Sequence, residues 1–301
     1  MKTTLSHLPF FAAVLLASGC TTLDCTSLQQ AMAANHKATI SLLNKTNEED
    51  LPLIKRDKMR DVSPTVGFSE EDLSMIAPTD IAAWDKILSG LDAYCTALVT
   101  LTSGKSSSDF STAAESLGSN IQSLGKKLNV TVGSKASYAE TAITELGSVL
   151  IQQKAEKEAQ GIAKKADPSF QAVIQDLIDA LGYTGNPLKR NGLGTLGMYE
   201  QDFSDIAAVN GTLYPNDSIA KFASMSSDDR GKAIDGFTAW LKVKQDHDDF
   251  AESYDALATA LYKTAQAHAA LANGSKETAS SALAALKAQI QNSAAIYQKF
   301  K

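Results

Sequence analysis

The chain has 301 residues, of which 44% are hydrophobic and 21% are charged, so it is long enough to bury a substantial core. Its 34 acidic residues outnumber its 28 lysines and arginines, which gives a formal net charge of −6. An acidic surface of mixed charge argues against nucleic acid or an anionic lipid surface as the main partner. Abundant Ala, Leu, Lys, Gln and Ser favour helix over sheet.

The first twenty residues have the three parts of an export signal. Lys2 supplies positive charge, residues 8–16 form a short apolar run, and the small residues 17–19 precede Cys20. The apolar run is roughly half of the 20 or so residues that a helix needs to cross a bilayer. We therefore interpret residues 1–19 as a cleaved signal peptide and not as a permanent membrane span.

Residues 16–20, with the sequence Leu-Ala-Ser-Gly-Cys, resemble the lipobox of bacterial lipoproteins. That resemblance implies cleavage between Gly19 and Cys20, acylation of Cys20 with fatty acids such as palmitate, and a mature domain over 20–301 that its acyl chains hold to membrane lipid. By the sorting rule of enteric lipoproteins, Thr21 after the cysteine implies the outer membrane, and we expect the protein to face the periplasm. An ordinary secretory signal with a small-residue cleavage site is the alternative.

The first half of the mature chain predicts three helices and one irregular connection. Apolar residues recur every three or four positions over 24–46 and again over 79–104, and polar capping residues precede a third helix over 108–128. Three prolines and a glycine interrupt this rhythm over 47–78, so we expect an irregular connection there.

The second half predicts the longest helix of the chain. A helix over 134–165 should be followed by a new one that starts with Asp167-Pro168 as N-cap and first helical residue. Residues 183–198 are glycine-rich and predict a second irregular connection. A helix over 226–273 would be about 70 Å long, and Ser275 suits the N-cap of the last helix. The expected fold is an all-α, elongated, antiparallel helical bundle with long, coiled-coil-like helices.

Two cysteines besides Cys20 lie in the mature chain, Cys25 and Cys95. If their helices run antiparallel, the start of the first helix meets the end of the second, which is the geometry that a disulfide requires. Closing a loop of about 70 residues would stabilise the protein by roughly 4 kcal/mol. We favour a bridge, and two buried reduced cysteines are the alternative.

No motif in the sequence predicts a cofactor, a metal or a catalytic centre. Glycines 192, 194 and 197 match the dinucleotide-binding fingerprint, but residues 187–190 do not form the strand that this fingerprint requires, so we interpret the glycines as a flexible turn. His247 and His268 lie about 32 Å apart along one expected helix and cannot bind one ion.

The densest acidic patch has the residues Asp246, Asp248, Asp249, Glu252 and Asp255. Lysines stand four residues before the first two of these aspartates, which favours a solvated helix face with weak ion pairs over a calcium site.

The anchor, the long apolar seams and the missing catalytic motifs predict a non-enzymatic envelope component that binds another envelope protein. One alternative is a binding module, in which the bundle encloses a small apolar or cell-wall ligand in a pocket near Trp240, His247 and Tyr254. A cell-envelope enzyme is the least favoured interpretation, because no catalytic constellation stands out.

Overall fold

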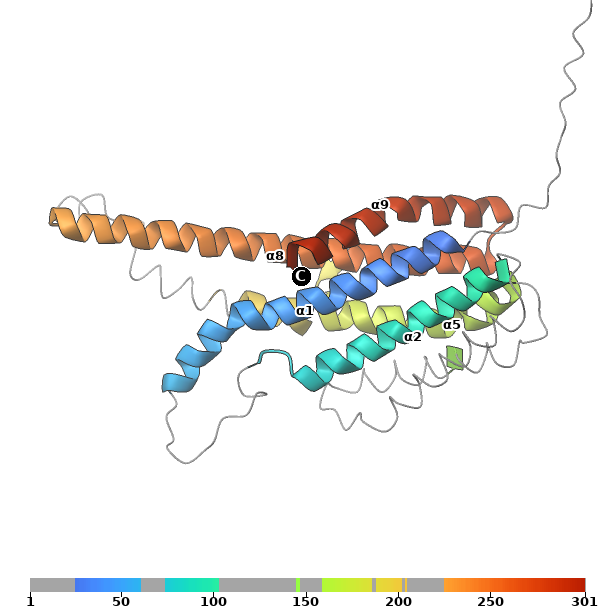
Figure 1. Cartoon of the computed structure of the whole chain (residues 1–301), viewed down its shortest axis with the longest axis horizontal. Helices are drawn as coiled ribbons and strands as arrows, with labels where there is room; N and C mark the ends of the chain where they lie inside the picture. Colours follow the sequence, from blue (N-terminus) through green and yellow to red (C-terminus); the bar gives the residue numbers. More distant parts are fainter. Residues whose placement is uncertain are drawn as a thin grey trace, which may run out of the picture.

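A computed structural model of the chain describes residues 25–60, 74–102, 145–146, 159–185, 188–201, 204 and 225–300. This part is dominated by long helices, which pack side by side in an elongated bundle (Figure 1). The helices are α1 (Thr26–Arg60), α2 (Pro78–Thr102), α5 (Ala159–Leu181), α8 (Ser227–Asn273) and α9 (Lys276–Phe300). The predicted all-α class is confirmed.

Polar contacts between α1 and α2 show that these two helices are antiparallel. Gln29 Nε2 donates to Asp92 Oδ1 at 3.1 Å, and two turns further along α1, His36 Nε2 lies 2.7 Å from Asp85 Oδ1. Advancing along α1 therefore means going back along α2. In the same way α8 runs opposite to α1, α5 and α9, so that α1 and α9 run parallel to each other (Figure 1).

The apolar seam predicted for the longest helix forms the centre of the core from residue 250 onward. Its members there are at most 3% exposed, and they are Phe250, Tyr254, Leu257, Leu261, Thr264, His268 and Leu271. Apolar side chains of α1, α2, α5 and α9 pack around this seam in one continuous cluster. Because α8 contacts three neighbours over this stretch, every turn of its second half is fixed by packing.

The first predicted helix is longer than its sequence pattern indicated. We expected an irregular connection from residue 47, but α1 continues through Pro52 to Arg60. Residues 47–60 are rich in Glu, Leu, Lys and Arg, which favour helix. A proline removes one backbone hydrogen bond and bends a helix more often than it ends one that its neighbours support. The prediction at this position was wrong because it gave one residue too much weight.

A second proline was also misread. We expected a helix to restart at Asp167-Pro168, but α5 passes through Pro168 without interruption. Its buried face keeps the same helical spacing on both sides of the proline, through Ile162, Ala166, Phe170 and Ile174. Core packing on both sides therefore outweighs the local cost of the proline. The helix predicted over 108–128, and residues 134–158 of the next one except 145–146, lie outside the described residues.

The glycine-rich region after α5 forms a compact turn. Strands β1 (Tyr183–Thr184) and β2 (Lys189–Arg190) pair antiparallel, and residues 194–201 are helical. Gly194 has a φ of +69°, and a Cβ there would lie 2.5 Å from the carbonyl oxygen of Ala180, so only glycine fits. Backbone conformation and close packing therefore both require glycine at this position of the turn.

The N-cap predicted for the last helix is confirmed, and Ser226 caps α8 in the same way. Ser226 Oγ accepts a hydrogen bond from the backbone N–H of Asp229 at 3.1 Å, and Ser275 Oγ accepts one from Thr278 at 3.2 Å. Within the described residues, no helix combines the length and the apolar character needed to cross a membrane.

Candidate functional site

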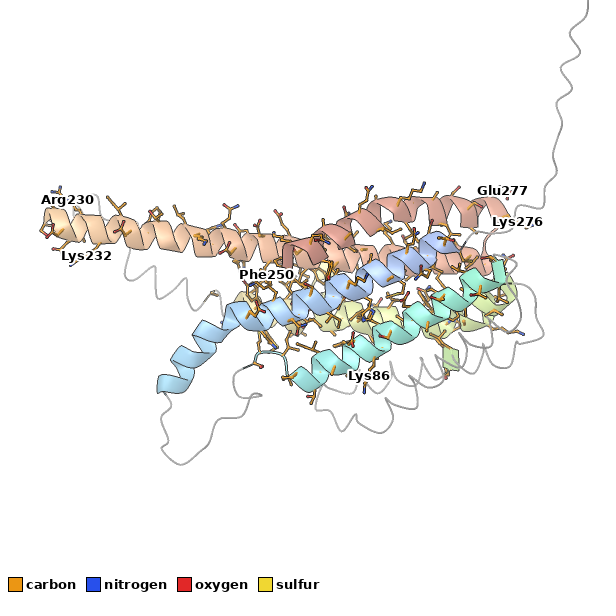
Figure 2. The ribbon with its side chains drawn as sticks, viewed as in Figure 1. Lys86, Arg230, Lys232, Phe250, Lys276 and Glu277 are labelled. Carbon is orange, nitrogen blue, oxygen red and sulfur yellow. The ribbon has the colours of Figure 1, made fainter. Side chains whose placement is uncertain are left out.

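The first half of α8 extends beyond the rest of the bundle. Figure 1 shows α8 continuing past the C-terminal end of α9, and Figure 2 shows Arg230 and Lys232 near the far tip and Phe250 where the packed body begins. We call residues 227–249 the arm. At 1.5 Å per residue the arm is about 34 Å long.

Three large apolar side chains on the arm are exposed. Ile234 is 54% exposed, Phe237 45% and Leu241 48%. Their spacing of three and four residues places them on one side of the helix, and we call them the arm stripe. Single exposed apolar residues are common on protein surfaces, but an aligned set on a projecting helix is the usual form of a helical docking face.

The base of the arm is held to α9 and to the helical segment 194–201. Lys299 Nζ of α9 lies 3.2 Å from Asp249 Oδ2, and the rings of Phe250 and Phe300 lie 4.7 Å apart. On another side, the His247 ring stacks on Tyr199 with 5.5 Å between centroids. These contacts fix the direction in which the arm leaves the body.

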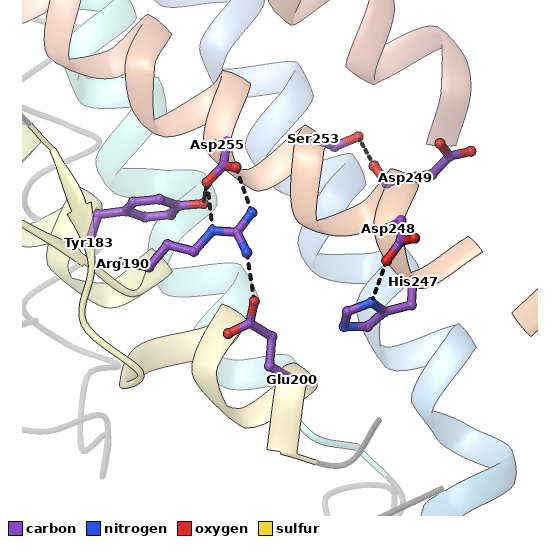
Figure 3. Close-up of polar contacts among 8 residues, drawn as sticks. All are labelled: Tyr183, Arg190, Glu200, His247, Asp248, Asp249, Ser253 and Asp255. Atoms are coloured by element: carbon purple, nitrogen blue, oxygen red, sulfur yellow. Dashed lines mark hydrogen bonds and ion pairs between the residues drawn. The ribbon is translucent and has the colours of Figure 1, made fainter. Parts of the chain in front are cut away.

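A cluster of four side chains adds a further attachment (Figure 3). Arg190 on β2 donates from Nε to Asp255 Oδ1 at 2.9 Å and from an Nη to Asp255 Oδ2 at 2.5 Å. Its other Nη donates to Glu200 at 2.8 Å, and the Tyr183 hydroxyl donates to Asp255 at 2.6 Å. We call these residues the latch, because they join the hairpin and the helical segment 194–201 to α8.

The pKa shifts of the latch residues are those expected for an ion pair that holds two parts of the structure together. Burial by itself would raise the pKa of Asp255, but the hydrogen bonds from Arg190 and Tyr183 outweigh burial and hold the pKa below its ordinary value. Burial and the bond to Asp255 together raise the pKa of Tyr183. Bidentate guanidinium–carboxylate contacts give geometric precision as well as energy. Arg190 and Asp255 are 65 residues apart in the sequence, so no local sequence pattern indicates that they pair.

A second polar cluster lies inside the body and joins α2, α5 and α8. The Tyr94 hydroxyl lies 2.8 Å from His268 Nε2, and His268 Nδ1 lies 2.8 Å from Asp167 Oδ1. Burial lowers the pKa of His268 against the opposing effect of Asp167, so the ring is neutral at neutral pH. The Asp167 carboxylate can only accept, so Nδ1–H donates to Asp167 and the Tyr94 hydroxyl donates to Nε2.

Tyr94, His268 and Asp167 are hydrogen-bonded in the order of a proton relay. The two rings are buried, however, and a catalytic site must be accessible to its substrate. Tyr94 and His268 are both fully buried, and Phe170 stacks on the His268 ring with centroids 4.1 Å apart. Both ring nitrogens already have protein partners. The cluster therefore fixes how three helices pack, and a substrate has no route to its nitrogens past the stacked ring.

The ligand pocket near Trp240, His247 and Tyr254 stays a prediction, because only two of these side chains lie in the described part of the structure. Tyr254 is fully buried, and its hydroxyl lies 2.8 Å from Thr46 Oγ1. His247 lies at the base of the arm beside Asp248, with its Nδ1 3.3 Å from the carboxylate. Trp240 belongs to the arm, and its side chain lies outside the described residues.

The other predicted site residues have different outcomes. Gly19 and Cys20 lie outside the described residues, so the cleavage and acylation predictions stand as predictions. Cys25 and Cys95 are both buried, as expected, but no disulfide joins them, so the structure does not have the favoured bridge. Burial raises the pKa of the Cys95 thiol, which keeps it protonated and disfavours the thiolate needed for oxidation.

The acidic patch of α8 is divided among separate ion pairs. Asp248 pairs with Lys244 at 2.7 Å, as the spacing predicted, whereas Asp249 pairs with Lys299 of α9. Within the described residues, no three His, Cys, Asp or Glu side chains gather closely enough to bind a metal. The ion pairs thus account for most of the patch.

No protein-family model, curated protein or solved structure matches this chain. We therefore infer the function from the arm, its attachment to the body and the sequence before α1.

Proposed function

We propose that the chain is a membrane-anchored envelope lipoprotein without enzymatic activity, which binds another envelope protein through the arm of α8. The observation that carries this proposal is the arm stripe, three half-exposed apolar side chains on a helix that leaves the body. Docking of helices into apolar grooves uses anchor residues with this spacing.

The geometry supports a role at a distance from the membrane. Helix α1 begins at the end of the bundle where α8 turns into α9, and the arm projects from the opposite end (Figure 1). Thr26 is the sixth residue after Cys20, so an acylated Cys20 would lie within about 20 Å of that end. From Asn273 back to Ile234 the helix spans about 58 Å. An anchored protein would thus hold the arm stripe well away from the lipid.

Burial of the arm stripe can make a measurable contribution to the affinity for a partner. Complete burial of a large apolar side chain contributes about 1.5 to 3 kcal/mol, and these side chains are about half exposed. Each can therefore add about 1 kcal/mol on binding, and the three together about 3 kcal/mol. That sum corresponds to a change of about a hundredfold in affinity.

The test compares two triple-alanine variants of the arm in cells that make the acylated protein. One variant replaces the arm stripe, and the control replaces Lys232, Asp235 and Asp246, which lie on the opposite side of the helix. Photo-crosslinking from the arm should give one defined product with the wild type and the control and lose it with the arm-stripe variant. The same product from both variants, or the absence of fatty acid on Cys20, would contradict the proposal.

A further inference from the structure

A groove of about 1050 Å³ opens on the body, away from the arm stripe and the latch. Its lining comes from the middle of α1 (residues 36–48), the start of α2 (residues 78–85) and the end of α9 (residues 297–300). Small-molecule sites in proteins commonly have volumes of about 300 to 1,000 Å³. The groove is therefore large enough for an organic ligand.

Polar contacts between α1 and its neighbours mark two positions along the groove. Near one end, the Asn47 side chain exchanges two 2.8 Å hydrogen bonds with the backbone N–H and C=O of Ile76. Near the other, His36 Nε2 contacts Asp85 Oδ1 across α1 and α2. The two contacts are about 16 Å apart along α1. A groove of this length suits a compact molecule better than a long partner helix.

The chemistry of the lining favours a ligand with an apolar body and one negative charge. Apolar groups line much of the groove, and they are Ile40, Pro78, Ile81, Tyr297 and Phe300. Both acidic lining residues are engaged, because Asp85 contacts His36 and Glu48 pairs with Lys45 at 2.9 Å. Lys37 makes no direct ion pair or hydrogen bond within the described part of the chain, and Asp92, with which it interacts electrostatically, lies outside the groove lining, so Lys37 is open to a ligand anion.

We propose that this groove binds an amphipathic carboxylate, with its hydrocarbon body on Ile40, Ile81 and Tyr297 and its carboxylate beside Lys37. The acyl chains expected on Cys20 are poor candidates for the occupant, because a fatty acid in ester or amide linkage has no free carboxylate to place beside Lys37. The ligand is therefore a separate molecule. The proposal does not depend on the partner protein proposed for the arm.

The probe for the test is dodecanoate, titrated calorimetrically below its micelle concentration into the mature chain carrying Cys20→Ser. Dodecanol and dodecyltrimethylammonium are the neutral and cationic comparisons. Lys37→Gln should weaken dodecanoate binding about tenfold, because it removes a charge-assisted contact. Lys276→Gln is the matched control, since it removes the same charge from the start of α9, outside the groove lining.

A second pair of variants tests the place of binding. Ala82 is an exposed residue of the groove lining, so Ala82→Phe should fill the groove and abolish binding without entering the core. Ala284→Phe places the same ring at an exposed position of α9 and should leave binding unchanged. Equal affinity for the cationic probe, unchanged binding in Lys37→Gln and Ala82→Phe, or no binding of dodecanoate would overturn the proposal.

Discussion

Two buried tyrosines allow a free-energy cost to be measured, that of leaving a buried hydrogen-bond acceptor without its donor. The change in both cases is from tyrosine to phenylalanine. Tyr94 and Tyr254 are both fully buried, and each hydroxyl has one protein partner at 2.8 Å. Tyr94→Phe leaves His268 Nε2 buried without its donor, which costs about 2 kcal/mol. Tyr254→Phe leaves no such orphan, because Thr46 Oγ1 also donates to the Leu42 carbonyl at 2.8 Å. We expect that variant to lose only about 1 kcal/mol.

The assay is urea unfolding of the mature chain at pH 7.5, followed by far-ultraviolet circular dichroism. Both variants leave a void of one oxygen atom, so the difference between them isolates the orphaned nitrogen. Tyr262→Phe serves as the control and should change the free energy of unfolding by less than about 0.5 kcal/mol, because this ring is only partly buried. Equal losses for Tyr94→Phe and Tyr254→Phe, at unchanged denaturant dependence, would refute the reasoning.

Three further predictions concern pH, backbone conformation and the latch. The folded protein holds His268 with a pKa below its ordinary value of 6.5, so the unfolded chain takes up a proton first and stability should fall as pH decreases below that value. His268→Gln should flatten this part of a plot of unfolding free energy against pH, and an unchanged slope would contradict the assignment. Gly194→Ala should cost about 3 kcal/mol in urea unfolding, whereas Gly192→Ala should cost about 1 kcal/mol, because both have positive φ but only the first meets backbone atoms. Arg190→Ala should lower the free energy of unfolding by less than about 1.5 kcal/mol, because the ion pairs of Arg190 are half exposed. The same variant should speed backbone hydrogen exchange across the hairpin. Unaltered exchange would show that the latch does not stabilise the hairpin.

The helices could be predicted where apolar residues repeat without interruption. The pattern of α2 predicted a helix from Thr79, and the helix begins at Pro78. The misreadings at Pro52 and Pro168 share one cause, because a proline gives a strong local signal whose cost long-range packing can outweigh. Sequence periodicity reports which face is apolar but not how firmly neighbouring helices hold it.

The candidate sites were harder to predict because they depend on contacts between distant parts of the chain. The seam of the longest helix runs from Trp240 to Leu271 in the sequence, and nothing in its spacing shows that the packed body begins near Phe250. That boundary is set by where the neighbouring helices end. Arg190 was overlooked for a related reason, since its partner Asp255 lies 65 residues away on α8 and looked like one of several solvated acids.

Buried polar residues link the helices at positions where the pattern of apolar and polar residues does not indicate which side chains will meet. The Asn35 amide donates to Thr264 Oγ1 at 3.0 Å and accepts from Ser293 Oγ at 2.7 Å, which joins α1, α8 and α9 at one level of the core. A shift of one turn along any of these helices would separate the partners and leave buried polar groups unsatisfied. Such contacts can select one register where apolar contacts tolerate several.

The arm combines a docking face with weak intrinsic helix stability, and this combination can be tested at one residue. Gly231 lies near the tip of the arm, and a Cβ there would meet no atom within 4 Å, so its only local effect is to weaken the helix. Gly231→Ala should stabilise the free arm by up to about 1 kcal/mol, which reduces the ordering cost of binding. If the proposed partner binds the helical arm, this variant should strengthen binding by up to about fivefold although the residue lies outside the arm stripe. Weaker binding by Gly231→Ala, with helix content unchanged or increased, would mean that the partner recognises some other conformation of the arm.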